Sequence, residues 1–197
     1  MKFTLIFSLL TFVALMSLQA QENALPFREI PPKPEQYKAG TMMARLVEGL
    51  GYRYYWATEG LNQADLDYRP TAEARSVWET LEHLYGLSET IANAALQKPN
   101  LRPMKDIPQE IEAMRAATLE HLETARDIFI KSEAADFEDY EVIFQRGGQN
   151  FEFPFWNMIN GPMADALNHV GQIVSFRRSS GNPINPKVNV FLGKAPE

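Results

Sequence analysis

The chain has 197 residues, no cysteine and a formal net charge of −6. Its length fits one domain that is large enough to bury a hydrophobic core. A composition of 45% hydrophobic and 22% charged residues excludes a disordered or fibrous protein. The acidic balance argues against nucleic-acid binding, which needs a basic face, and without thiolates any metal must be held by imidazole and oxygen.

The first twenty residues have the pattern of a secretory signal peptide. Lys2 gives a positive start, residues 3–18 are almost wholly apolar, and Ala20 ends the segment before a polar stretch. The apolar run is shorter than the ~20 residues that span a bilayer, and an uncleaved N-terminal anchor is the alternative. We expect cleavage after Ala20 and export to the periplasm or the exterior, with no stable membrane anchor in the mature chain.

A proline-rich lead-in and a first helix come next. Residues 21–34 contain four prolines and are expected to be extended. A helix is predicted from Glu35 to about Glu59, because apolar residues recur there at helical spacing. Its predicted buried stripe consists of Met43, Leu46, Val47, Leu50, Tyr54 and Ala57. Gly60 ends this helix, and turn residues fill the loop up to Pro70.

The second and third helices are marked by a capping box and by regular core faces. Ser76 and Glu79 form the capping box, and the second helix then runs to about Lys98. The third helix is predicted from about Ile107 to about Ser132. The core faces are Val77, Leu81, Leu84, Ser88, Ile91 and Ala95 on the second helix, and Ile111, Met114, Thr118, Leu122, Ala125 and Phe129 on the third.

The rest of the chain changes period twice. Residues 140–153 alternate as strands do on either side of a Gly-Gly pair, which predicts a small β-hairpin. A last helix is predicted from about Asn160 to Ser179, followed by an extended tail over residues 181–197. The predicted fold class is therefore all-α: a four-helix bundle over residues 35–197 with a small β-hairpin inserted before the fourth helix.

The chain has only three histidines, and two of them fall at informative positions. Asp165 and His169 are one turn apart on the last helix, so their side chains share a face. They lie at the rim of an apolar arc, where a half-buried carboxylate needs a partner. His83 lies beside the core face of the second helix. The arc on the last helix consists of Met163, Ala166, Leu167, Val170, Ile173 and Val174.

Two imidazoles and one carboxylate on facing helices would hold one divalent transition metal ion, such as Zn, Ni or Fe, and leave coordination positions open. The alternatives are an ion pair or a buried polar network for Asp165 and His169, and a core histidine bonded to a carbonyl for His83. His121, off the core stripe of the third helix, is predicted to be a partly exposed surface histidine.

Three segments resemble the DinB/YfiT-like superfamily of metal-binding four-helix bundles. They are Leu66–Pro70 (LDYRP), Ser76–Leu84 (SVWETLEHL) and Asp165–Ile173 (DALNHVGQI), and the likeness covers most of the mature chain. The resemblance implies that a histidine on the second helix joins two ligands four residues apart on the fourth, which His83 and His169 match. Asp165 departs from the pattern, because the family more usually has histidine there. An aspartate ligand shifts the expected metal toward Fe, Mn or Zn.

Other side chains are expected to support the site or the core. Glu79 and Gln172, each about one turn from a predicted imidazole ligand, are candidates to orient it, although the capping box also explains Glu79. Trp156 and Asn157 precede the last helix and are placed at the rim of the site. The aromatic residues of segment 52–56 are expected to pack in the core.

Three functions remain open. The first is a metal-dependent hydrolase or transferase acting on a small molecule, since the resemblance implies thiol transfer or metal-assisted hydrolysis. Export argues against thiol transfer, because the small thiols that it uses are expected in the cytoplasm. The second is a non-enzymatic, exported binding or stress module stabilised by its metal. The third is a metal-free polar network at the same residues. No catalytic residue is assigned, and a homodimer is left open.

Overall fold

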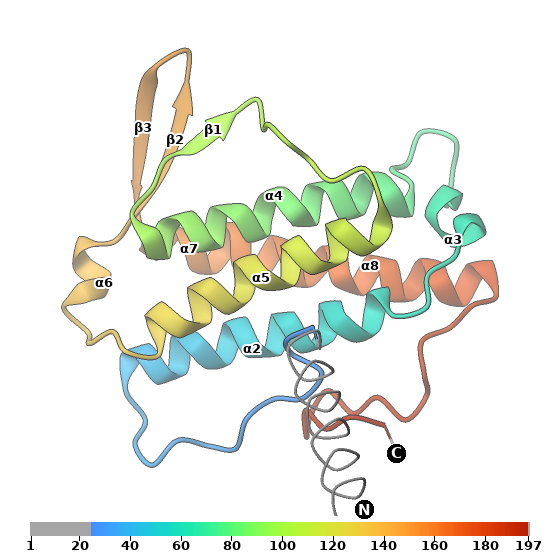
Figure 1. The fold of residues 1–197 in the computed structure, drawn as a ribbon, viewed down its shortest axis with the longest axis horizontal. Coiled ribbons are helices and arrows are strands. Elements are labelled where there is room, and N and C mark those ends of the chain that lie inside the picture. The colour runs from blue at the N-terminus through green and yellow to red at the C-terminus, as the bar shows by residue number, and fades with distance from the viewer. Residues whose placement is uncertain (1–24, 197) are drawn as a thin grey trace, which may run out of the picture.

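The computed structural model describes residues 25–196, and Figure 1 shows that this part of the chain is mostly helical. The predicted signal peptide and its cleavage point at Ala20 lie outside the described residues. Residues 25–34 contain neither helix nor strand, and residues 26–29 form turns and bends rather than extended chain. Within residues 25–196, no helix is both long enough and apolar enough to cross a membrane.

Four long helices dominate the described residues. They are α2 (Ala39–Thr58), α4 (Val77–Leu96), α5 (Ile111–Phe129) and α8 (Ala164–Ser180). The shorter helical elements are α3 (Gln63–Asp67), α6 (Asp136–Asp139), α7 (Trp156–Met158) and the π-helix η1 (Ile159–Met163). The strands are β1 (Asn100–Arg102), β2 (Glu141–Arg146) and β3 (Gln149–Pro154). Helix α2 begins four residues later than the predicted start at Glu35.

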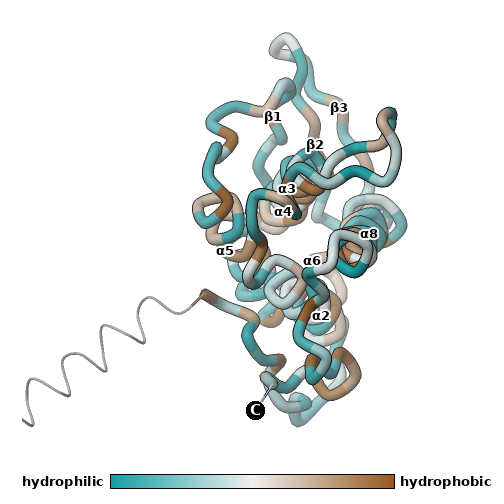
Figure 2. The backbone as a smooth tube through the Cα atoms, turned by 90° about the vertical axis from the view of Figure 1, so that its right-hand side faces the viewer, coloured by the Kyte–Doolittle hydropathy of each residue, from teal (hydrophilic) through white to brown (hydrophobic). Residues whose placement is uncertain are grey.

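The long helices enclose one continuous hydrophobic core. Helix α5 packs against both α2 and α4, and α8 contacts the same two helices. Figure 2 views these helices nearly end-on and shows them grouped around a common centre. The predicted core faces of α4 and α5 are buried, apart from the partly buried Ile111. Helical periodicity therefore predicted correctly which faces of α4 and α5 point inward.

Two leucines that were predicted to lie in the core are exposed instead. Leu46 on α2 is 46% exposed and Leu167 on α8 is 37% exposed. Both line a groove between α2 and α8. Periodicity identifies the apolar face of a helix, but it cannot show whether a neighbouring element covers that face.

The prediction of an isolated hairpin is wrong, because the sheet is three-stranded and mixed. Strands β2 and β3 pair antiparallel, and β1 pairs with β2 in parallel on its other edge. Buried Asn100 holds β1 in place: its side-chain amide donates to the Ile143 carbonyl at 2.9 Å and its oxygen accepts from Asn93 at 3.0 Å. A strand of three residues is too short to carry a periodic signal.

The last helix also begins later than predicted. The chain passes through η1, in which Gly161 has non-helical angles (φ −89°, ψ −108°), and α8 starts at Ala164 rather than near Asn160. Pro162 contributes to this irregularity, because proline lacks the N–H donor and its ring clashes with the preceding turn. The irregular turn ends directly before Asp165, which therefore falls in the first turn of α8.

The C-terminal end of α8 is fastened to the rest of the fold by buried polar contacts. The guanidinium of Arg177 donates to the carbonyls of Ala57 and Glu59 at 3.0 and 2.7 Å. Buried Asp65, in a segment predicted to be a loop but folded as α3, accepts from Ser180 at 2.7 Å. These bonds join the C-terminal end of α8 to the end of α2 and to α3.

Candidate metal centre

His83, Asp165 and His169 meet between α4 and α8. His83 Nε2 lies 3.0 Å from Asp165 Oδ2, and His169 Nε2 lies 3.3 Å from Asp165 Oδ1. The two imidazole rings have centroids 4.6 Å apart and are nearly perpendicular, at 89°. One ligand atom from each residue can be chosen so that all lie within 4.8 Å of one another. The three side chains predicted as a triad are thus together, and this group could hold a metal ion.

Local helix structure places these ligands. Helix α4, which carries His83, starts at a capping box in which Ser76 Oγ accepts from the Glu79 N–H at 3.1 Å and the Glu79 carboxylate accepts from the Ser76 N–H at 2.7 Å. Asp165 lies in the first turn of α8, where the helix dipole favours a negative charge. An ionised carboxylate is the form that binds a metal.

Gln172 orients one of the two imidazoles. Its Oε1 lies 2.8 Å from His169 Nδ1. An amide oxygen can only accept, so Nδ1 carries the proton and Nε2, the nitrogen nearer to Asp165, keeps its lone pair. The structure therefore puts Gln172 in the supporting position predicted for it.

Glu79 does not take the supporting role predicted for it. Among the described residues, its carboxylate accepts from the Ser76 N–H and pairs with Arg69 at 3.0 Å. These two partners hold the pKa of Glu79 below its usual value. Both partners bind Glu79 Oε2 at the start of α4, and within the described residues no hydrogen bond or ion pair joins Glu79 to His83. The capping box therefore explains Glu79.

The spacing of the donor atoms fits a coordinated ion. For bonds of about 2.1 Å, neighbouring ligand atoms lie about 3.0 Å apart in an octahedron and about 3.4 Å apart in a tetrahedron. The separations of 3.0 and 3.3 Å end on different oxygens of Asp165, and one ligand atom from each of the three residues can be chosen within 4.8 Å of the others. Imidazole nitrogen and carboxylate oxygen are also ordinary ligands of divalent transition metals. The residues present therefore fit a metal by the chemistry of their donor atoms, and one atom from each lies close enough to the others for the group to hold an ion.

The three side chains differ in how far they are exposed. The side chain of His169 is 13% exposed, that of His83 is 33% exposed and that of Asp165 is 43% exposed. In the part of the chain that the structure describes, no fourth histidine, aspartate or glutamate belongs to this group. Three protein ligands with open positions are typical of catalytic sites, whereas structural sites are usually closed by a fourth ligand.

His121 is separate from this group. Its Nδ1 hydrogen bonds with Ser88 Oγ at 3.1 Å, and its ring packs 5.1 Å from that of Tyr85. Burial lowers its pKa, so the ring is neutral at neutral pH. His121 is partly exposed, as predicted, but it also ties α5 to α4, which its place on the helical wheel did not reveal.

The aromatic residues divide between the core and the surface. In segment 52–56, Tyr52, Tyr54 and Trp56 are buried, which confirms the predicted core packing. Trp156, predicted to rim the metal site, is 76% exposed and lines an apolar pocket of about 590 Å³ that Met42 also lines. Among the described residues, no hydrogen bond, ion pair or ring contact links Trp156 or its neighbour Asn157 to the triad.

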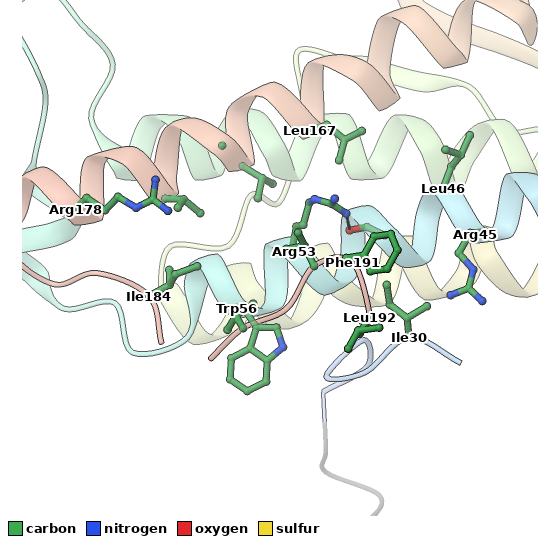
Figure 3. Close-up of a pocket in the computed structure, with 16 residues that line it drawn as sticks. Ile30, Arg45, Leu46, Arg53, Trp56, Leu167, Arg178, Ile184, Phe191 and Leu192 are labelled. Atoms are coloured by element: carbon green, nitrogen blue, oxygen red, sulfur yellow. Dashed lines mark hydrogen bonds between the residues drawn. The ribbon is translucent and has the colours of Figure 1, made fainter. Parts of the chain in front are cut away.

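The largest of the cavities described lies on the opposite face of α8 from the triad. It has a volume of about 860 Å³ and is bounded by α2, α8 and the C-terminal tail (Figure 3).

In comparisons with known proteins, no family model and no curated protein matches the chain. The functional assignment consequently depends on the geometry and chemistry of the site itself.

Proposed function

We propose that this chain is an exported, DinB-like metal-binding protein whose His83, Asp165 and His169 hold one divalent transition metal ion for hydrolysis or group transfer on a small molecule. One observation carries the proposal. Ligand atoms from two helices, with His83 and Asp165 separated by 82 positions in the sequence, lie within 4.8 Å of one another.

The arrangement of the long helices supports the DinB-like assignment. We interpret α2, α4, α5 and α8 as the four helices of a bundle, because α5 and α8 each pack against both α2 and α4. One ligand then comes from the second helix of the bundle and two, four residues apart, from the fourth. This is the distribution that the resemblance implies, with Asp165 in place of the more usual histidine.

The side chains of the site have separate roles in this proposal. When bound, the ion would supply Lewis-acid chemistry, polarising a substrate atom or activating water at neutral pH. Asp165 lies between the two imidazoles and contributes the negative charge. Gln172 holds His169 so that its Nε2 lone pair stays available. The exposed side leaves room for water and substrate, and the ligand set suits Zn, Ni, Fe or Mn.

Elemental analysis of the purified chain tests the site. We expect about one equivalent of transition metal in the wild type, and less than a tenth of that in His83→Ala and His169→Ala. His121→Ala is the matched control, because it removes an imidazole outside the group and should keep the metal. Equal metal content in the wild type and His83→Ala would overturn the proposal and favour a metal-free network in which His83 donates to Asp165.

A metal-stabilised module without catalysis is the second candidate. It is favoured by one observation: the larger cavities in residues 25–196 are lined by none of the three ligands. A chelator separates the two candidates. Removing a catalytic metal should leave a folded, inactive chain, whereas removing a structural metal should unfold it, which circular dichroism would detect.

A further inference from the structure

The groove between α2 and α8 is a second candidate site on the other face of α8. Leu167, Gly171, Val174 and Arg178 recur at helical spacing and line it, while Asp165, His169 and Gln172 share the face toward α4. Its volume of about 860 Å³ is within the range of small-molecule sites. Figure 3 shows Leu46 and Leu167 facing the space between the two helices.

The outer wall of the groove is a turn of the C-terminal tail, residues 189–193, which is held by hydrogen bonds to its backbone. The side-chain oxygen of Asn189 accepts from the N–H groups of Phe191 and Leu192, both at 3.1 Å, and the Asn189 carbonyl accepts from the Gly193 N–H at 2.8 Å. The Gly193 carbonyl in turn accepts from the Ile30 N–H at 2.8 Å. Phe191 is nevertheless 93% exposed and Leu192 is 60% exposed. The fold therefore fixes two large apolar side chains in the open, which is typical of a binding surface.

Two positive charges accompany this apolar surface. Within the described residues, no carboxylate lies at ion-pair distance from Arg53 or Arg178, and the one hydrogen bond that the Arg53 side chain makes there is to the Gly49 carbonyl at 3.0 Å. Arg45, which also lines the groove, is by contrast paired with Glu48 at 3.4 Å. In a chain of net charge −6, two guanidiniums without acidic partners beside one groove indicate an anionic ligand.

We propose that this groove binds an aliphatic carboxylate of medium chain length. Its carboxylate would pair with a guanidinium that lines the groove, that of Arg53 or that of Arg178, both labelled in Figure 3. Its hydrocarbon chain would lie along Leu46, Leu167 and Phe191. A concave apolar groove with cationic groups matches an amphipathic monoanion better than the flat surface of a partner protein. The proposal is independent of the metal, because α8 separates the two sites.

Calorimetric titration of the purified chain with dodecanoate, below its micelle concentration, tests the charge requirement. We expect saturable binding of one equivalent and at least about tenfold weaker binding to the double variant Arg53→Gln/Arg178→Gln. Arg75→Gln, on the exposed loop before α4, should bind as the wild type does. Dodecanol should bind at least about tenfold more weakly than dodecanoate. Equal binding of the alcohol, or no binding of dodecanoate, would overturn the proposal.

A steric variant tests the location. A Cβ placed on Gly171 meets nothing within 4 Å, so the side chain of Gly171→Leu would start in open space at the groove, and the substitution removes a glycine from a helix interior. It should abolish dodecanoate binding, while Thr124→Leu, which adds the same side chain to exposed α5, should not. Unchanged binding by Gly171→Leu would overturn the site. A wild-type dimer in sedimentation whose interface closes the groove would also overturn the site. Binding to anionic phosphatidylglycerol vesicles without binding of free dodecanoate would do so too.

Discussion

At the scale of single residues, Asp165 is where the candidate metal centre departs from the ligand pattern that the sequence resemblance implies. Its two oxygens lie 3.0 and 3.3 Å from the two imidazoles, so it contacts both other ligands at once. It brings a negative charge that a third imidazole would lack, and its place in the first turn of α8 favours that charge. The charge of Asp165, rather than its shape alone, should therefore govern metal affinity.

Substitution of Asp165 separates charge from shape. Asp165→Asn keeps the outline of the side chain but removes the charge, and we expect metal affinity to fall at least about 100-fold, since even outer partners of a metal site are worth 10–100-fold. Asp165→His restores the family pattern and should retain binding. Calorimetric titration with zinc measures both variants. An Asp165→Asn variant that binds zinc like the wild type would show that Asp165 is not a ligand.

Substitution of Gln172 tests whether its hydrogen bond to His169 contributes to metal affinity. Gln172→Ala removes the acceptor for His169 Nδ1, so the ring loses its fixed orientation and zinc affinity should fall by about 10–100-fold. Gln172→Glu keeps an acceptor and should stay close to the wild type. If both variants titrate like the wild type, the bond between Gln172 and His169 has no bearing on metal binding.

At the scale of elements, the capping box is expected to stabilise the start of α4, the helix that carries His83. Ser76→Ala removes the oxygen that accepts from the Glu79 N–H, and the free energy of unfolding should fall by about 1 kcal/mol. Urea denaturation measures the change. Ser179→Ala, at an exposed position near the end of α8, is the control and should change stability by less than about 0.5 kcal/mol. A Ser76→Ala effect no larger than this control would show that the capping box does not stabilise α4.

The contact between α3 and the end of α8 makes stability depend on pH. Burial alone would raise the pKa of Asp65, but hydrogen bonds from the Asn182 side chain, the Asn62 N–H and the Ser180 hydroxyl outweigh it and lower the pKa below 3.8. A lowered carboxyl pKa stabilises the fold at higher pH, and this stability is lost as the pH falls from about 3.8 through the folded value.

Denaturation of the wild type and Asp65→Asn at several pH values checks this dependence. The wild type should be the more stable protein near neutral pH, and its advantage should shrink as the pH falls below about 3.8. An advantage that stays constant down to pH 2 would contradict the role assigned to the Asp65 carboxylate.

The elements that were predictable are those with local signals. The capping box at Ser76 and the apolar faces of α4 and α5 can be read within a few turns of sequence. The candidate metal ligands follow from the apolar arc of α8, from the place of His83 beside the core face of α4, and from the resemblance. The pairing of β1 through Asn100 and the non-helical Gly161 were not predictable, because tertiary contacts and a single irregular turn decide them. Exposed Leu46 was missed for a related reason: sequence shows an apolar face but not the element that leaves it uncovered.

At the scale of the whole molecule, α8 separates two surfaces of different chemistry. One face carries Asp165 and His169, which form the candidate metal centre with His83, and the opposite face lines the apolar groove beside the C-terminal tail. The chain is long enough to enclose one core, and both candidate sites lie at the margins of that core. Mutations that abolish binding at one site should therefore leave the other intact.

Export is the remaining property of the whole chain that can be tested. When the chain is expressed in a bacterial host, we expect a periplasmic product that begins at Gln21, because the first twenty residues have the pattern of a cleaved signal. Mass spectrometry of the fractionated protein identifies the terminus. A variant without residues 2–20 should stay in the cytoplasm, and recovery of the uncleaved chain from the membrane fraction would favour an anchor instead.

The most direct test of the metal centre is an anomalous-scattering map from crystals of the zinc-loaded chain. The account predicts one strong peak about 2.0–2.2 Å from His83 Nε2, His169 Nε2 and an Asp165 oxygen. A map without a peak between α4 and α8, or a peak bound by other residues while His83 still hydrogen bonds to Asp165, would contradict it.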